Sequence, residues 1–385
     1  MKTFYNIFLV SLFFIKVSYS QIQPTSSPYY NNGVYSLIWD SATVNSKKVV
    51  MYRPAVAPVN KYPVFIFQPG ANGVFGGNIN VHTYDLFLHH LASWGFVVLV
   101  IDETTAGMPS GTTFKSVHTW LKDKMADNTH WLYTYADPSK VVIGGHSNGG
   151  VNASGLLVER PTEIHGIVYF ASYPSDNFMV PQDVSNYSGK VLSLAGSEDN
   201  SSTPSSCKNG YNAYTSASCK SYALITGLGH AGFGDYTHSS QVVGSIGREN
   251  ATATIRHYFL SFMLGQFNND NTAMANLTQT NLQPNTTGEF LSNCGGTVSI
   301  NKLTNNCSIN IYPNPACNFI NLSFDICTEG NTTAYVYDVS GRELLKTIVE
   351  PSKEFKIDIR QFQKGFYFLK IENHNKLYTT TFIKN

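Results

Sequence analysis

A serine flanked by glycines follows a short apolar run in the middle of the chain. Residues 145–149 read Gly-His-Ser-Asn-Gly, directly after Val141-Val142-Ile143 and before a segment with the apolar spacing of a helix. A G-x-S-x-G segment between a strand and a helix makes a sharp, strained turn that holds the serine hydroxyl clear of the sheet. Glycine two residues to either side leaves room for the crossing backbone. Ser147 is therefore the predicted nucleophile.

A serine hydroxyl is a poor nucleophile at neutral pH, so a base must take its proton and a carboxylate must hold the tautomer of that base. In this arrangement the acid and then the base follow the serine along the chain. Asp199 is the preferred acid because it comes three residues after the glycine that ends an apolar run, and Glu198 is the alternative. His230 lies in a glycine-rich segment after the last such run and is the predicted base, with His238 as its rival.

The oxyanion that forms when a serine attacks a carbonyl needs backbone N–H donors aimed at it. One is expected from Asn148, the residue after the nucleophile, and the other from the loop after the third strand, where Ala71 is the candidate. Aromatic side chains also fall in three loops expected around the serine, and we expect them to contact the substrate. These aromatic residues are Phe75, Tyr173 and Phe233.

Strand-like and helix-like patterns alternate from residue 34 to about 266, and this alternation predicts an α/β fold with a doubly wound, mostly parallel sheet. The segment 21–267 is the predicted catalytic domain, with an antiparallel edge over Val34–Asp40 and Lys48–Arg53. The predicted core strands are Val64–Phe67, Phe96–Ile101, Val141–Ile143, Gly166–Phe170, Val191–Leu194 and Tyr222–Ile225, and the predicted helices are His82–Trp94, Phe114–Met125 and Val151–Val158.

The composition favours a folded, exported protein. Twenty-six Lys and Arg against 25 Asp and Glu leave a net charge of +1, so there is no basic field to bind nucleic acid. Hydrophobic residues make up 42% of the chain, enough for a packed core. Residues 1–20 have the positive start, apolar run and small residues of a secretory signal peptide. We expect a monomer with no membrane span in the mature protein.

Six cysteines in an exported chain predict disulfide bonds. Their positions suggest three local pairs. No CxxC or Cys/His cluster indicates zinc, and the predicted chemistry needs neither a metal nor another cofactor. The suggested pairs are Cys207–Cys219, Cys294–Cys307 and Cys317–Cys327.

Asn and Thr become frequent after Phe267, and few periodic apolar residues occur before Ile309, so residues 268–308 are the predicted linker. Strand-like segments alone follow, which predicts a small all-β sandwich over 309–385. The predicted strands are Ile320–Phe324, Ala334–Asp338, Phe355–Ile359, Gly365–Ile371 and Lys376–Ile383.

This last segment resembles the C-terminal sorting domain of the type IX secretion pathway of Bacteroidetes. The resemblance lies in Ile311-Tyr312-Pro313-Asn314-Pro315, Tyr337-Asp338-Val339-Ser340-Gly341-Arg342, Gly365-Phe366-Tyr367-Phe368 and Phe382-Ile383-Lys384. It implies passage across the inner membrane by the N-terminal signal and across the outer membrane through the type IX machinery. It also implies removal of the domain during release or surface attachment. The alternative is an accessory β-domain that binds a substrate.

Residues from about Met51 to Met263 resemble the dienelactone-hydrolase, chlorophyllase and polyester-hydrolase (PET hydrolase-like) branch of α/β-hydrolases. The resemblance lies in Met51-Tyr52-Arg53-Pro54, Pro63-Val64-Phe65 to Pro69-Gly70, Leu91-Ala92-Ser93-Trp94-Gly95-Phe96-Val97-Val98, the Ser147 turn, Gly196–Asp199 and the His230 loop. It implies ester cleavage by Ser147, Asp199 and His230 without a metal. Asn148 stands where polyester hydrolases of this branch usually carry Met.

These observations predict a secreted serine hydrolase that cleaves carboxylic esters through an acyl-enzyme intermediate, with aromatic esters or polyesters as candidate substrates. The alternatives are a lipase or peptidase of the same fold, or a catalytically idle fold used for binding. No long apolar insertion that could form a lid stands between the core strands, so we expect activity on soluble esters without interfacial activation.

Overall fold

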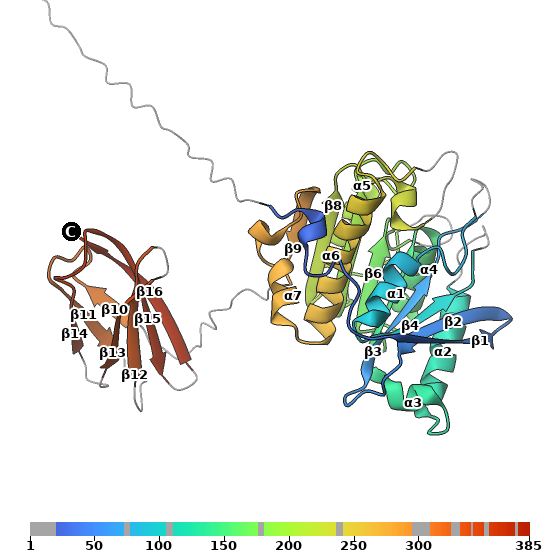
Figure 1. Cartoon of the computed structure of the whole chain (residues 1–385), viewed down its shortest axis with the longest axis horizontal. Helices are drawn as coiled ribbons and strands as arrows, with labels where there is room; N and C mark the ends of the chain where they lie inside the picture. Colours follow the sequence, from blue (N-terminus) through green and yellow to red (C-terminus); the bar gives the residue numbers. More distant parts are fainter. Residues whose placement is uncertain are drawn as a thin grey trace, which may run out of the picture. The chain divides into compact units, whose positions relative to one another are not determined.

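The computed structural model describes residues 21–72, 78–104, 111–175, 181–235, 242–294, 309–324, 332–339, 342–349, 354–373 and 376–385. The chain divides into two compact units, Met1–Thr297 and Val298–Asn385 (Figure 1). The predicted signal peptide, residues 1–20, lies outside the described residues. Across the described part of the chain, no helix has the length and apolar character needed to cross a membrane.

A nine-stranded sheet runs through the first unit. Its strands are β1 (Leu37–Val44), β2 (Lys47–Pro54), β3 (Tyr62–Gln68), β4 (Val97–Ile101), β5 (Ala136–His146), β6 (Gly166–Phe170), β7 (Lys190–Gly196), β8 (Cys219–Ile225) and β9 (Thr287–Ser292). They lie in the order β1-β2-β4-β3-β5-β6-β7-β8-β9. The pairs β1–β2, β2–β4 and β8–β9 are antiparallel and all others are parallel. The predicted doubly wound α/β fold is confirmed.

Helices cover both faces of this sheet (Figure 1). The α-helices are α1 (Asp85–Ser93), α2 (Thr112–Ala126), α3 (Trp131–Tyr135), α4 (Asn148–Glu159), α5 (Pro204–Ala213), α6 (Arg248–Phe267) and α7 (Asn271–Asn276), and the 3-10 helices are η1 (Pro24–Ser26), η2 (His230–Phe233) and η3 (Thr280–Leu282). Helices α1 and α6 pack on the face that carries Phe65 and Phe67. Helices α2, α3 and α4 pack on the face that carries Val64 and Ile66. Because both faces are covered, the central strands read as continuous apolar runs.

The predicted linker over 268–308 is wrong in its first part. Helix α7 begins after Asp270, whose carboxylate accepts a hydrogen bond from the Ala273 N–H at 2.9 Å. Strand β9 then pairs with β8 and completes the sheet. The sequence did not indicate β9 because an edge strand is half-exposed, so Thr287–Ser292 shows no continuous apolar run.

The predicted cysteine pairs are also corrected. Cys219 forms a disulfide with Cys294, and Cys207 is a buried free thiol, so neither Cys207–Cys219 nor Cys294–Cys307 exists. The physical reason is that β9 pairs with β8 and so brings Cys294 beside Cys219, although 75 residues separate the two cysteines in the sequence. Cys317 is an exposed free thiol, and its predicted partner Cys327 lies outside the described residues.

The second unit contains two antiparallel sheets, as expected for a small all-β domain. Their orders are β10-β11-β14 and β13-β12-β15-β16. A buried cluster that includes Ile320, Val336, Leu369 and Phe382 joins residues of both sheets. The strands are β10 (Ile309–Tyr312), β11 (Phe319–Phe324), β12 (Thr332–Tyr337), β13 (Glu343–Val349), β14 (Glu354–Asp358), β15 (Gly365–Asn373) and β16 (Lys376–Lys384).

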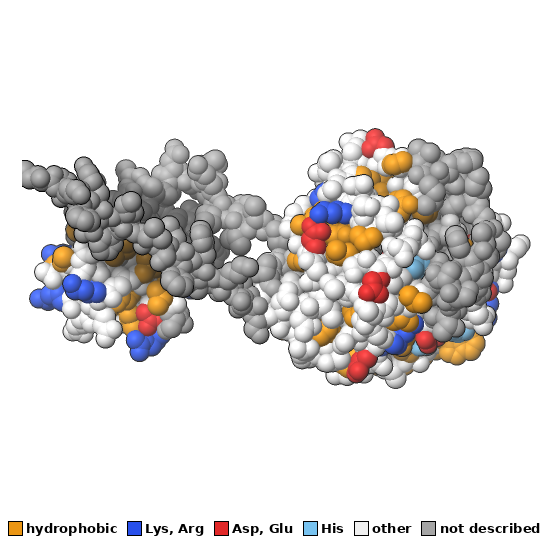
Figure 2. Space-filling view, turned by 90° about the horizontal axis from the view of Figure 1, so that it is seen from above, with side chains coloured by type: hydrophobic (Ala, Val, Ile, Leu, Met, Phe, Trp, Pro, Cys, Tyr) orange, Lys and Arg blue, Asp and Glu red, His pale blue; other side chains and the backbone are white. Residues whose placement is uncertain are grey.

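Uncharged groups dominate the face of the first unit that Figure 2 presents. Charged side chains are scattered among them and form no field of one sign in this view. This agrees with a chain in which only 13% of residues are charged.

Candidate functional site

Ser147 lies at the turn between β5 and α4, with φ of 52° and ψ of −122°. A positive φ in a residue other than glycine is uncommon and costs about 1–3 kcal/mol, so such strain is retained where surrounding structure enforces it. Neighbouring glycines make the turn possible: a Cβ on Gly145 would lie 2.3 Å from the Gly149 carbonyl carbon. The Ser147 N–H donates to the Phe170 carbonyl at 3.0 Å, and its carbonyl accepts from Ser172 Oγ at 2.7 Å. The serine backbone is therefore fixed on both sides.

Asp199 and His230 form a buried pair after neighbouring strands. Asp199 Oδ2 accepts a hydrogen bond from His230 Nδ1 at 2.7 Å, with side-chain exposures of 0% and 5%. The other carboxylate oxygen, Oδ1, accepts from the N–H groups of Ser201 and Ser202, each at 2.8 Å. Because these amides fix the carboxylate, it can hold the imidazole in one orientation, with Nδ1 protonated and Nε2 left as the basic nitrogen.

The alternative acid, Glu198, points elsewhere. Its Oε2 accepts from the Ser245 N–H at 2.8 Å, and its Oε1 accepts from the Ser245 hydroxyl. These hydrogen bonds lower the pKa of the Glu198 carboxyl. Glu198 is thus paired with Ser245, while Asp199 is paired with His230. The rival base His238 lies outside the described residues.

His146, which directly precedes Ser147, connects the turn to His230, the predicted base. Its ring is fully buried, and the ring centroids of His146 and His230 are 4.5 Å apart. The His146 ring also forms a hydrogen bond with the backbone of His230. Burial holds the pKa of His146 well below its usual value, so the ring is neutral. Two histidines from distant parts of the chain therefore lie in contact beside Ser147.

Tyr84 extends this contact to the loop after β3. Its Oη accepts from the Gly70 N–H at 3.0 Å and lies 2.8 Å from His146 Nδ1. A tyrosine hydroxyl has one proton, so an oxygen that accepts from Gly70 can donate to Nδ1 and leave the proton of His146 on Nε2. Tyr84 could not be found from local sequence patterns, because 62 residues separate it from His146.

Of the two predicted oxyanion donors, Asn148 lies at the same turn, and the chain that leads to Ala71 approaches it. Asn148 is the first residue of α4, where backbone N–H groups have no acceptor within the helix and the helix dipole favours negative charge. The loop that carries Ala71 approaches the same turn, because a Cβ on Gly149 would lie 2.0 Å from the Gln68 carbonyl oxygen. The close approach of these two backbones requires glycine at position 149.

Comparison with known families agrees with the fold of both units. Residues 65–241 match the family described as "Alpha/beta hydrolase family". This segment matches that family and has the alpha/beta hydrolase fold. Residues 310–385 match the family described as "Secretion system C-terminal sorting domain", which indicates export by the type IX system to the cell surface or the medium. No curated protein matches the chain.

Of the three predicted aromatic contacts, the structure places two and contradicts one. Phe233 is fully buried and packs against His146 and Phe170, with centroid distances of 5.9 Å each. Its prediction as a substrate contact is wrong, because η2 turns the side chain into the core. Tyr173 is partly buried against α5, where a Cβ on Gly210 would lie 2.6 Å from Tyr173 Cβ. Phe75 lies outside the described residues.

Metal ligands do not cluster in the described part of the hydrolase domain or of the sorting domain. No group of three or more His, Cys, Asp or Glu side chains there could hold a metal ion. The arrangement around Ser147 instead supplies a nucleophile candidate, a carboxylate–imidazole pair and backbone N–H groups. Those components suit acyl transfer.

Proposed function

We propose that this protein is a secreted serine hydrolase that cleaves carboxylic esters with Ser147, His230 and Asp199. The observation that carries the proposal is the buried hydrogen bond between Asp199 and His230, with the His146 ring connecting His230 to the Ser147 turn. Such a pair provides the base and the orienting carboxylate that a serine nucleophile needs.

In the proposed mechanism, Ser147 Oγ gives its proton to His230 Nε2 as it attacks the ester carbonyl. Asp199 stays ionised and stabilises the imidazolium through Nδ1–H. The backbone N–H groups of Asn148 and Ala71 receive the negative charge that develops on the carbonyl oxygen. His230 then protonates the departing alkoxide, which leaves an acyl-enzyme, and the same groups deliver a water molecule that releases the acid.

The test is covalent labelling combined with turnover. A fluorophosphonate probe is expected to label the wild-type protein at Ser147 and to leave Ser147→Ala unlabelled. The Ser147→Ala variant is expected to lose about 10⁴-fold or more in kcat toward p-nitrophenyl butyrate, with an unchanged circular-dichroism spectrum. A variant that keeps more than about a hundredth of wild-type kcat would contradict the assignment.

The substrate range is proposed from the resemblance of the catalytic segment to dienelactone and polyester hydrolases. Short-chain and aromatic esters are the expected substrates, cleaved without interfacial activation. Hydrolysis of p-nitrophenyl butyrate measured across its solubility limit is expected to rise smoothly. A sharp rise at emulsion formation would favour a lipase, and cleavage of peptide substrates instead of esters would favour a peptidase.

A further inference from the structure

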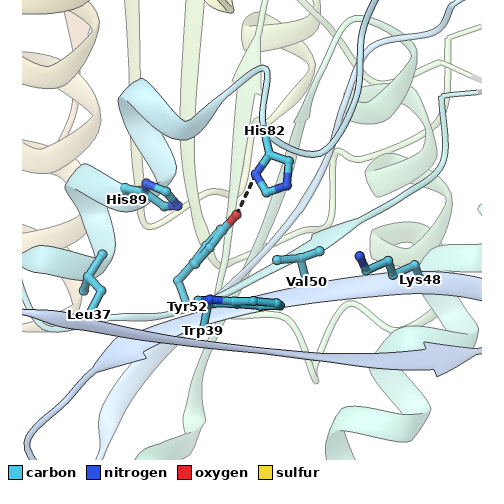
Figure 3. Close-up of a pocket in the computed structure, with 7 residues that line it drawn as sticks. All are labelled: Leu37, Trp39, Lys48, Val50, Tyr52, His82 and His89. Atoms are coloured by element: carbon cyan, nitrogen blue, oxygen red, sulfur yellow. Dashed lines mark hydrogen bonds between the residues drawn. The ribbon is translucent and has the colours of Figure 1, made fainter.

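A hollow lies on the first unit, with none of the proposed catalytic residues in its wall. It is a cavity of about 430 Å³ on the β1–β2 hairpin (Figure 3). Its strand residues are Leu37, Trp39, Lys48, Val50 and Tyr52. They share one face because side chains alternate along a strand and because Trp39 pairs with Tyr52 across the hairpin. His82 and His89 close the cavity from the segment before α1 and from α1 itself.

Trp39 provides a flat apolar wall. Its side chain is 67% exposed, whereas the other tryptophans are only partly exposed. In Figure 3 its ring lies along the strand with one face turned to the side on which His82 lies. Val50 and Tyr52 are almost completely buried and add apolar surface beside it. The wall is therefore suited to a flat ring, because aromatic rings pack best in offset-stacked or edge-to-face contacts.

Asp85 holds the polar ends of Tyr52, His82 and His89. Its Oδ1 accepts from Tyr52 Oη at 3.3 Å and lies 3.5 Å from His89 Nε2. Its Oδ2 lies 3.0 Å from His82 Nδ1. Burial, followed by the nearby Asp85 charge, raises the pKa of Tyr52, so its hydroxyl stays protonated. The carboxylate of Asp85 is thus occupied by neighbours within the wall.

Lys48 contributes a positive charge at the rim. Its ammonium end points toward Val50 and the cavity in Figure 3. The adjacent Lys47 forms an ion pair with Glu103 at 2.7 Å, whereas Lys48 has no ion pair with any residue that the structure describes. A ligand that fills the cavity would therefore meet one cation without a carboxylate partner.

We propose that this cavity binds a small aryl carboxylate, with its ring on the face of Trp39 and its carboxylate near the Lys48 ammonium. The binding site is independent of catalysis. If the proposed ester cleavage holds, the acid released from an aryl ester would belong to the ligand class of this cavity.

The test is a titration of the full-length Ser147→Ala variant with benzoate, in which saturation-transfer NMR measures binding. This variant is used so that the result does not depend on turnover. Millimolar binding is expected for a single exposed ring contact and one ion pair. Trp39→Ala is expected to weaken binding by about tenfold or more, and Lys48→Met by roughly threefold, with the Lys48 effect shrinking at high salt. Benzamide and cyclohexanecarboxylate are each expected to bind more weakly than benzoate.

Matched controls come from the same two strands. Ile38→Ala removes an exposed side chain from the neighbouring, opposite-facing position, and Lys47→Met removes the paired lysine. Neither is expected to change the benzoate Kd by more than about twofold, within the scatter of surface substitutions. Absence of benzoate binding at tens of millimolar, or equal losses in control and test variants, would overturn the proposal. Benzamide binding as tightly as benzoate would overturn the role of Lys48. Cyclohexanecarboxylate binding as tightly as benzoate would overturn the role of the flat ring.

Discussion

At the scale of single residues, the structure bears most on which of two adjacent carboxylates, Asp199 or Glu198, is the predicted acid. The Asp199 carboxylate contacts His230, while the adjacent Glu198 contacts Ser245. Asp199→Asn is therefore expected to lower kcat by roughly 10⁴, because the imidazole loses its correct tautomer. Glu198→Gln is the matched control and should leave kcat within about twofold, as a surface substitution does. Steady-state kinetics with p-nitrophenyl butyrate measure both, and the reverse ranking would move the acid to Glu198.

Tyr84 is expected to act as a positioning residue. Tyr84→Phe leaves the ring in place but removes the hydroxyl that joins Gly70 to His146. The Gly70 N–H and the His146 ring then lose a shared hydrogen-bond partner. Unpaired buried groups cost about 1–3 kcal/mol. We therefore expect kcat to fall about tenfold with little change in KM.

The control for Tyr84 is Tyr169→Phe. Tyr169 is also buried, and its hydroxyl bonds to Ser154 and Tyr214 on the other face of the sheet. It should lower the free energy of unfolding by a similar amount and leave kcat unchanged. Equal losses of kcat in both variants would reduce Tyr84 to a purely structural role.

At the scale of elements, the disulfide ties the last strand of the sheet to its neighbour. Cys219 begins β8 and Cys294 follows β9, with 75 residues between them. A crosslink of that span is expected to stabilise the fold by about 2–4 kcal/mol, mainly by restricting the unfolded chain. The double substitution Cys219→Ala and Cys294→Ala should lower the free energy of unfolding by that amount and so lower the urea midpoint. The exposed Cys317→Ser should have no effect. Equal midpoints in the parent and the double variant would contradict the pairing.

Local sequence patterns were informative for elements and for residues placed by them. The glycines around Ser147 and the position of Asp199 after β7 follow from backbone geometry, which short segments encode. Phe233 could not be placed, because whether an aromatic side chain beside His230 turns inward depends on η2 packing against the core. Cys294 and Tyr84 could not be assigned either, since their partners lie 75 and 62 residues away and only the completed sheet brings them together.

At the scale of the whole molecule, buried neutral histidines make the fold sensitive to acid. Burial lowers the pKa of both His90 and His257 to about 3. The unfolded chain binds these protons near pH 6.5, so below that pH it holds more protons than the folded chain, and stability falls as pH falls toward 3. Each group should contribute about 1.4 kcal/mol per pH unit in that window. Urea denaturation at pH 7.5, 6 and 5 measures the slope, and His257→Gln should reduce it. An unchanged stability down to pH 4 would contradict the prediction.

The second unit is expected to act only as an export address. Its strands bury their own cluster around Val336 and Leu369, so removal of residues 309–385 should leave the hydrolase unit folded. The truncated protein, purified after recombinant expression, should keep the kcat and KM of the full chain toward p-nitrophenyl butyrate.

In a host that has the type IX system, the truncated protein should remain inside the cell envelope, whereas the full chain reaches the medium or the cell surface. Fractionation followed by immunoblotting separates these locations. Normal secretion of the truncated chain would contradict the export role, and a raised KM for an insoluble polyester with unchanged secretion would favour an accessory substrate-binding domain.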